Sequence, residues 1–403
     1  MYIHSPTFVN RTYKFRIYPT DEQAEALDRQ LSLCRVLYNA ALEQRISAYK
    51  IGVSVTYNMQ QNELPSVKRD NPEYSLVHSQ VIQDVLHRLD GAFANFFRRV
   101  RERRARAGFP RFRSRDRYDS ITYPQTGFAI ERSKLRLSKI GNVKIVKHRE
   151  AAGKVRTCTI KRDRCGDWYA SFSCELPDVP PVAVKTAIGV DVGLKALAVT
   201  SAGDVIKPQR LMPAYAWKLK HEQQNLGRKQ KGSENRRKQK RTLARVHRKI
   251  ERARDDYLHR VAKQIVGSAD VVVFENLSIQ NMLRNHNLAL SITDASWGKL
   301  MQFCAYKAEE AGKRVEYIDP RGTSQICSQC GATVRKSLSD RVHECQACSL
   351  VMDRDLNASF NILGRGRIGL EQTESELENA CGEGRLQDGS PVPLIEAGMS
   401  TRS

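Results

Sequence analysis

Two closely spaced cysteine pairs restrict the fold of this chain more than any other feature. Cys327 and Cys330 form the first pair, Cys345 and Cys348 form the second, and 14 residues lie between the pairs. Each pair has the spacing of a zinc knuckle, and Gly331 allows the tight turn after the first pair. Four thiolates close a tetrahedral structural Zn²⁺ site. The sequence therefore predicts one zinc ribbon.

Other roles for these cysteines fit the pattern less well. A redox CxxC motif belongs before a helix in a thioredoxin-like unit, and it is not expected twice within 22 residues. His343 could replace one thiolate, but we expect it to be a bystander. The chain starts without an apolar signal-peptide segment, and its apolar runs are too short to span a bilayer. We therefore expect a cytoplasmic protein whose thiols stay reduced.

The charge of the chain predicts a polyanionic partner. Lys and Arg number 67 against 44 Asp and Glu, which gives a formal net charge of +23. Residues 371–403 carry seven acidic and two basic side chains and lack periodicity, so we expect a disordered acidic tail there. The positive charge lies in the rest of the chain. Nucleic acid is the partner that this charge favours.

One basic stretch stands out at residues 228–254, which contain 13 Lys and Arg but only two Glu. Leu243, Val246 and Ile250 recur at helical spacing, which predicts a helix with one packed face. An ordinary solvated helix face mixes both signs of charge, so we favour contact with nucleic-acid phosphates. The candidate contact residues are Lys229, Arg236, Arg237, Lys238, Lys240 and Arg241.

A second basic segment, FPRFR at residues 109–113, interleaves aromatic side chains with arginines. Arginine binds phosphate and stacks on bases, so Arg111 and Arg113 are candidate nucleic-acid contacts. A basic edge strand explains the same pattern equally well. The sequence alone does not decide between the two interpretations.

The first part of the chain predicts helices that interrupt a small β-domain. Residues 12–18 alternate as a short strand, and Thr20 with Gln23 then forms a capping box that begins a long helix. A second long helix has its apolar face between Ile82 and Val100, and we expect Gly108 to end it.

Strand-like runs separated by turn residues follow over 109–178, and the strand at 12–18 completes this β-domain. From Lys185 onward, strands alternate with helices, which predicts an α/β domain.

Two acidic residues lie in strands of the α/β domain whose other side chains are apolar. Asp191 occurs within AIGVDVG (187–193), and Glu275 occurs within VVVFENL (271–277). Burial of an unpaired carboxylate is costly and is tolerated where the group binds a cation or a base. In α/β sheets, ligands bind at the carboxyl ends of the strands. The alternative is an edge acid that pairs with a lysine or caps the next helix.

A third acid comes from Asp353 or Asp355, which precede a helical pattern. Asp is also a standard helix N-cap, and the spacing alone does not choose between the two residues. Two Mg²⁺ ions that activate water and stabilise a leaving phosphodiester oxygen need hard oxygen ligands from several converging elements. Acids on two strands and one helix would meet that need.

In this order, the motifs resemble the TnpB family of transposon-encoded RNA-guided nucleases, which are relatives of type V CRISPR effectors. The resemblance runs over roughly Thr12 to Leu363. It rests on GFPRFR (108–113), GVDVG (189–193), FENL (274–277), LSITDASWG (290–298), TSQICSQCG (323–331) and DRDLNAS (353–359). The resemblance selects Asp355 over Asp353, and it implies that Asp191, Glu275 and Asp355 are the catalytic, Mg²⁺-binding residues.

The family fold is α/β with additional small β and helical domains. It implies a RuvC-like RNase H domain with an inserted four-cysteine zinc ribbon, and a barrel-like wedge β-domain interrupted by a helical recognition domain. The predicted limits are 1–19 and 109–182 for the wedge domain, 20–108 for the recognition domain, 183–324 and 351–370 for the nuclease domain, 325–350 for the ribbon, and 371–403 for the tail.

The resemblance implies an RNA-guided, Mg²⁺-dependent DNA endonuclease. Such a protein binds a guide RNA from the transposon end, recognises a short transposon-adjacent motif and cleaves double-stranded target DNA. Two alternatives stay open: a nucleic-acid-binding regulator with a nuclease fold, and an RNA-independent RuvC-like nuclease or transposase. The presence of all three acids argues against the regulator. We expect a prokaryotic, nucleoid-associated protein without a membrane partner, with a monomer favoured.

Overall fold

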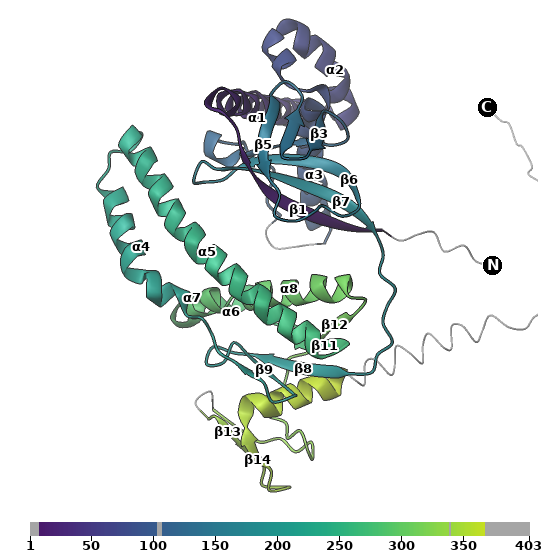
Figure 1. The fold of residues 1–403 in the computed structure, drawn as a ribbon, viewed down its shortest axis with the longest axis vertical. Coiled ribbons are helices and arrows are strands. Elements are labelled where there is room, and N and C mark those ends of the chain that lie inside the picture. Colours follow the sequence, from purple (N-terminus) through teal and green to yellow (C-terminus); the bar gives the residue numbers. More distant parts are fainter. Residues whose placement is uncertain (1–7, 103–106, 338–339, 367–403) are drawn as a thin grey trace, which may run out of the picture. The chain divides into compact units, whose positions relative to one another are not determined.

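The computed structural model describes residues 8–102, 107–337 and 340–366 (Figure 1). The chain divides into two compact units. The first unit comprises the chain up to Asp178 together with Lys218–Arg248, and the second comprises Val179–Trp217 and the chain from Lys249. The predicted acidic tail at 371–403 lies outside the described residues. Within the described parts, no helix is long and apolar enough to cross a membrane.

The first unit is built on a seven-stranded antiparallel sheet with the order β2-β6-β7-β1-β5-β4-β3. Its strands are β1 (Phe8–Tyr18), β2 (Ser120–Tyr123), β3 (Phe128–Glu131), β4 (Lys134–Leu137), β5 (Gly141–Val146), β6 (Lys154–Arg162) and β7 (Trp168–Pro177). The N-terminal strand β1 is central, because it pairs with both β7 and β5. Tyr13, Phe15 and Ile17 alternate along β1 and are buried. The strand order ends at β2 and β3, and the Tyr123 ring of β2 lies 6.5 Å from the Phe128 ring of β3, so the sheet is nearly closed, in agreement with the predicted barrel-like domain.

Helices α1 (Asp21–Lys50) and α3 (Ser79–Arg101) share one apolar core with this sheet. The predicted capping box is confirmed: the Thr20 side chain accepts from the Gln23 amide, and the Gln23 side chain accepts from the Thr20 amide. Helix α3 covers the predicted apolar face but ends at Arg101, before Gly108.

Helix α2 (Tyr57–Asp70) was not predicted from the sequence. Only Gln60 and Leu64 are buried in α2, so its apolar pattern is weak, and it contains Pro65. The 3₁₀ helices η1 (Pro72–Leu76) and η2 (Arg115–Arg117) complete the helices of this part of the chain.

The basic stretch 228–254 forms the turn after α4 (Leu211–Gly227) and the first part of α5 (Glu234–Ser268). Val246 and Ile250 are buried, which confirms the packed face that their spacing predicted. The boundary between the two units passes through both helices, because Lys218–Arg248 belongs to the first unit.

The second unit has a five-stranded sheet with the order β10-β9-β8-β11-β12. Its strands are β8 (Ala187–Val192), β9 (Ala198–Thr200), β10 (Val205–Ile206), β11 (Val271–Glu275) and β12 (Arg314–Ile318). Strands β8, β11 and β12 are parallel, whereas β9 pairs antiparallel with both β8 and β10. The remaining elements are α6 (Ile279–Met282), α7 (His286–Ala295), α8 (Trp297–Glu310), and the two-stranded sheet of β13 (Val342–Glu344) and β14 (Val351–Asp353). The predicted α/β character is confirmed.

The two faces of this sheet pack against different elements. Val190 and Phe274 point into a core shared with Leu258 of α5 and Leu300 of α8. The side chains of Val271 and Val273 alternate with these, and they pack against Ile362. Ile362 belongs to a final helical segment, residues 354–366, drawn in yellow without a label in Figure 1.

Candidate metal centres

Asp191 and Glu275 lie at the C-terminal ends of two adjacent parallel strands, as the penultimate residue of β8 and the last residue of β11. Val190 of β8 pairs with Phe274 of β11, so the two acids that follow are level with each other. Neighbouring strands are about 4.8 Å apart, and side chains alternate between the two faces of a sheet. Asp191 therefore shares a face with Gly189, and Glu275 shares that face with Val273. This is the face that packs against residues 354–366.

Two glycines let the final helix lie directly on these strands. A Cβ atom on Gly189 would lie 2.1 Å from the carbonyl oxygen of Ser359, and one on Gly366 would lie 2.5 Å from a methyl carbon of Val273. Any larger residue at Gly189 would push the helix backbone away from β8. The close packing brings the start of the helix, with Asp355, to the edge where β8 and β11 end.

The structure separates the two aspartates that spacing could not distinguish. The Asp353 carboxylate accepts hydrogen bonds from the amides of Asp355 (2.8 Å) and Leu356 (3.2 Å). Asp353 is thus the N-cap of the final helix. The Asp355 side chain makes no capping bond; instead, Arg354 donates to its Oδ1 from Nε (3.1 Å) and Nη2 (2.9 Å).

Burial and mutual repulsion make the charged forms of the acids at this edge less favourable, which raises their pKa values. Desolvation raises the pKa of Asp191 well above its usual range, and the nearby charges of Glu275 and Asp355 raise it further, while Arg354 opposes them. Burial also raises the pKa of Glu275, which is only 8% exposed, whereas a hydrogen bond from Thr323 and the charge of Arg365 lower it. Arg354 and Arg365 offset only part of the negative charge, because the pKa values of Asp191 and Glu275 stay raised, and the hard oxygen atoms of the cluster suit Mg²⁺.

The four predicted zinc ligands come together at one point. Their sulfur atoms all lie within 4.8 Å of one another, and within the described parts of the chain they are the only cluster of three or more ligand atoms this compact. The Cys327 and Cys348 sulfurs are 3.6 Å apart, and the Cys330 and Cys345 sulfurs are 3.5 Å apart. Tetrahedral coordination with zinc–sulfur bonds of about 2.3 Å needs about 3.8 Å between sulfurs. The geometry therefore fits Zn²⁺.

Each cysteine pair sits on the same type of turn. The Gly331 amide donates to the Cys327 carbonyl (2.9 Å), and the Ser349 amide donates to the Cys345 carbonyl (2.8 Å). Both turn residues have positive φ, +76° at Gly331 and +58° at Ser349. The sequence predicted the first turn from its glycine, but a serine in the second gave no such signal.

Two of the four thiols at the cysteine site have a lowered pKa, in contrast to the acid cluster, whereas the pKa of Cys330 and Cys348 is raised. Burial raises the pKa of the Cys327 and Cys345 thiols, but amide N–H groups that donate to each sulfur outweigh it and hold both pKa values at about 7. These amides belong to residues two and three positions after each cysteine, Gln329 and Cys330 in the first pair. His343 is fully buried nearby, and its Nδ1 contacts Lys336, but it is not a member of the four-residue cluster.

Polar residues that the sequence analysis missed join the ribbon to the acid cluster. The Thr323 hydroxyl donates to Glu275 Oε1, and Asn361 Nδ2 donates to the Thr323 carbonyl (2.8 Å). Asn357 Oδ1 accepts from the Ser328 amide (3.0 Å), while its Nδ2 donates to the Ile326 carbonyl (2.8 Å). The available signal was that Asn357 and Asn361 are spaced i, i+4 on one helix face. These bonds fix the entry of the ribbon onto the final helix.

The predicted phosphate contacts on α4 and α5 have different environments. Arg236 closes the turn between the helices, because its Nη1 donates to the carbonyls of Leu226 (2.6 Å) and Lys229 (2.9 Å). Arg237 pairs with Glu234, and Lys240 Nζ lies 3.8 Å from an Asp116 oxygen. The side chains that stay exposed are those of Lys229, Arg237, Lys238, Lys240 and Arg241. Arg111 and Arg113 are exposed on the separate segment 108–113.

Comparison with known proteins gives the family of the chain. Family models match at residues 7–52 ("Helix-turn-helix domain"), 171–286 ("Probable transposase") and 297–362 ("Cas12f1-like, TNB domain"). A Streptomyces pristinaespiralis protein named "Putative RNA-guided DNA endonuclease" is 35% identical over 385 residues, which cover 93% of this chain and 92% of that protein. The chain belongs to the TnpB family.

InsQ of Escherichia coli K12, which has the same description, is 31% identical to this TnpB chain over 413 residues, 96% of this chain and 98% of InsQ. Among solved structures, Cas12f1 in its complex with sgRNA and target DNA matches with a TM-score of 0.56 at 14% identity. The match covers 88% of this chain and 98% of Cas12f1. The TnpB chain thus shares the fold of Cas12f1.

Proposed function

We propose that this TnpB chain is a transposon-encoded, RNA-guided DNA endonuclease that uses Asp191, Glu275 and Asp355. The observation that carries the proposal is the convergence of these acids from β8, β11 and the final helix, with the pKa of Asp191 raised by desolvation and by the other two. A purely structural role would not require three mutually repelling carboxylates, and strongly perturbed acids mark functional sites. RNA guidance and a DNA substrate are supported by the names of the two relatives.

The three carboxylates would hold two Mg²⁺ ions, and the four cysteines would hold one structural Zn²⁺. When bound, the Mg²⁺ ions activate a water and stabilise the leaving 3′-oxygen of the cleaved strand. The Thr323 hydroxyl orients Glu275 through its hydrogen bond. Arg354 donates from Nε and Nη2 to Oδ1 of Asp355, which leaves Oδ2 for a cation, and its Nη1 donates to the Asp340 carbonyl.

The second unit is proposed to be a RuvC-like RNase H domain with an inserted zinc ribbon. The acids on adjacent parallel strands and on a helix packed at Gly189 support this assignment. The sheet and the helices α1 to α3 of the first unit are proposed to be the wedge and recognition domains, with the limits predicted from the sequence. The guide RNA and the target DNA are the proposed partners.

Cleavage of a guide-matched plasmid in Mg²⁺ tests the catalytic assignment. Asp191→Asn, Glu275→Gln and Asp355→Asn should each abolish cleavage and leave guide-RNA binding unchanged. Asp353→Asn is the matched control, because asparagine also caps helices well and the neighbouring acid is not assigned to catalysis. Cleavage by Asp191→Asn would refute the assignment. Cleavage by protein freed of RNA would refute RNA guidance.

A further inference from the structure

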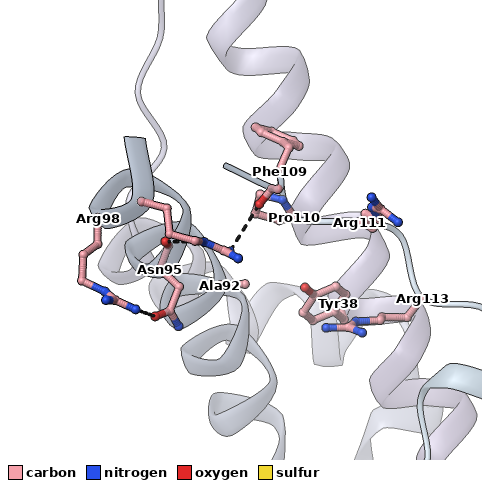
Figure 2. A pocket seen from close by; sticks show the side chains of 10 residues that line it. Tyr38, Ala92, Asn95, Arg98, Phe109, Pro110, Arg111 and Arg113 are labelled. Carbon is pink, nitrogen blue, oxygen red and sulfur yellow. Dashed lines mark hydrogen bonds between the residues drawn. The ribbon is translucent and has the colours of Figure 1, made fainter. Parts of the chain in front are cut away.

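A cavity of about 530 Å³ lies in the first unit between α1, α3 and the segment 108–113 (Figure 2). None of the described residues that line it is acidic. Four of its ten lining residues are arginines: Arg98 and Arg99 from α3, and Arg111 and Arg113 from the segment. The nearest described acid that offsets them is Glu102, which pairs with Arg98 at 3.2 Å. The cavity is therefore strongly cationic.

The arginines on α3 are held in place around Asn95. Arg99 Nε donates to the Asn95 carbonyl (3.0 Å), and its Nη2 reaches the Gly108 carbonyl (3.4 Å). Arg98 Nη2 donates to Asn95 Oδ1 (3.3 Å), as Figure 2 shows. These bonds tie the segment 108–113 to the end of α3. An anion that enters the cavity thus meets positioned donors, with less side-chain entropy to lose.

The segment is also fixed against α1. The amide of Arg113 donates to Asn39 Oδ1 (2.8 Å), and its carbonyl accepts from Asn39 Nδ2 (3.0 Å). The Arg113 guanidinium lies over the Tyr38 ring, 5.6 Å from its centre (Figure 2). This clamp holds the backbone on both sides of the Arg113 side chain and presents its guanidinium at the cavity wall.

Two groups in the wall have no partner among the described residues. Arg111 is exposed and makes no ion pair or hydrogen bond in the described parts of the chain. Tyr38 is only 3% exposed, yet its hydroxyl has no hydrogen-bond partner there. Buried polar groups are nearly always hydrogen-bonded, and each exception calls for an explanation. A polar ligand in the cavity would explain this one.

An aromatic side chain completes the wall. Phe109 is 47% exposed and is held edge-on by Phe93 (5.5 Å between ring centres, 89°) and Phe96 (5.2 Å, 77°). The cavity thus combines a fixed aromatic surface, guanidinium planes and a phosphate-binding charge. Proteins that bind single strands combine these same three elements, since bases stack on aromatic and guanidinium faces.

We propose that this cavity binds one unpaired nucleotide of a nucleic-acid strand. Its phosphate contacts Arg111 with Arg98 or Arg99, and its base stacks against Phe109 or the Arg113 guanidinium. The volume lies in the usual range for small-ligand sites, about 300–1,000 Å³, which admits a nucleotide but not a duplex. This inference rests on the proposed function, because it assigns a site to the guide RNA or to a target DNA strand.

Binding measured without cleavage tests the site. The full-length protein is titrated with guide RNA, and the resulting complex with target DNA, in the presence of a chelator. Arg111→Ala should weaken the binding of either the guide RNA or the target DNA by about five- to tenfold. For the same strand, the slope of log K against log salt concentration should become smaller by about 1. Arg69→Ala is the matched control, since Arg69 is an exposed arginine of α2 in the same unit, and it should bind as the wild type does. The strand affected identifies the occupant.

Photo-crosslinking supplies a readout that does not depend on a variant. Guide RNA with 4-thiouridine, or target DNA with 4-thiothymidine, should crosslink to a peptide that contains residues 108–113. If Arg111→Ala binds both strands as the wild type does and this crosslink is absent, the cavity is not a nucleotide site. The proposed function would still hold in that case if the wild-type protein cleaves DNA in Mg²⁺. If the wild type binds neither strand, both proposals fail.

Discussion

The acid cluster and the zinc ribbon are two candidate cation sites of the same unit that treat negative charge in opposite ways. At the ribbon, backbone amides hold the pKa of Cys327 and Cys345 at about 7, whereas the pKa of Cys330 and Cys348 is raised, so two of the four thiols ionise readily before a metal binds. At the sheet edge, desolvation and like charges raise the pKa of Asp191 well above its usual range. The ribbon lowers the pKa of two of its ligands, and the acid cluster raises the pKa of Asp191.

The difference follows from the elements that build each site. The ribbon ligands lie in turns, where free amides point at the sulfurs, whereas Asp191 and Glu275 end strands whose backbone groups are used in the sheet. A structural site gains stability from such preparation. A catalytic site gains affinity for divalent cations from carboxylates whose charge the neighbouring arginines offset only in part. The contrast supports a folding role for the ribbon and a chemical role for the cluster.

The largest expected effect follows from disruption of the ribbon. Cys327→Ser together with Cys330→Ser should reduce the zinc content from one ion per chain to none, measured by mass spectrometry of the metal. Structural zinc stabilises small domains by about 10–16 kcal/mol in isolated peptides, so we expect the ribbon to unfold. Cleavage should fall with it, because Thr323, Ser328 and Ile326 then no longer hold the acid cluster and the final helix.

His343→Gln is the matched control for the zinc experiment. This histidine is buried inside the ribbon but stands outside the four-sulfur cluster, so one zinc ion should remain. Loss of zinc in the histidine variant, or retention of it in the double cysteine variant, would refute a site made of the four cysteines.

The elements that could be predicted from the sequence were those with strong local patterns. The Thr20 capping box, the apolar face of α3 and the strands around Asp191 and Glu275 are short-range signals, and the structure has these elements. The weakly amphipathic α2 gave no such signal. The catalytic role of the three acids and the zinc stay predictions, which metal analysis and cleavage assays of the variants address.

The contacts that build the site could not be predicted, because they join residues far apart in the chain. Gly189 and Ser359 are in contact only after β8 and the final helix pack, and the hydrogen bond between Thr323 and Glu275 needs the same assembly. Choosing between Asp353 and Asp355 likewise required the helix to show which carboxylate caps it. The residue type at one position does not indicate which distant residue it will contact in the folded protein.

Neutralising the acid cluster should stabilise the metal-free protein. A carboxyl whose pKa is raised on folding binds its proton more tightly in the folded state, so stability is reduced above that pKa and is recovered as the pH falls through it. Asp191→Asn removes the charge, and it should raise the free energy of unfolding at pH 8. Urea denaturation of the chelator-treated protein measures this change.

The pH dependence provides the check on that prediction. The advantage of Asp191→Asn should shrink as the pH is lowered from 8 towards 5, since the wild-type carboxyl then takes up its proton. Asp353→Asn should show no such gain, because the Asp353 carboxylate accepts two amide hydrogen bonds. An equal gain in both variants would mean that general charge repulsion, and not this cluster, is relieved.

Removal of the Thr323 hydroxyl, which links the ribbon to the acid cluster, should have a smaller effect on cleavage. Thr323→Val keeps the shape of the side chain but removes its hydrogen bond to Glu275. A hydrogen bond to a charged group contributes about 1.5–3 kcal/mol, so cleavage should slow by about 10- to 100-fold. Thr323→Ser should restore it, and the zinc content of both variants should stay at one ion. A Thr323→Val variant with the wild-type rate would show that Glu275 is positioned without this bond.

The smallest expected effect concerns the cap of the final helix. Asp353→Ala removes the acceptor for two amides and should lower the free energy of unfolding by about 1 kcal/mol, whereas Asp353→Asn should change it by a few tenths. Cleavage at saturating Mg²⁺ should stay within about threefold of the wild type in both, because a cap contributes to stability and not to the metal ligands. A deep loss of cleavage in Asp353→Asn, with normal stability, would move the third acid from Asp355 to Asp353. It would also remove the distinction between a carboxylate that is satisfied by backbone amides and one that is left for a cation.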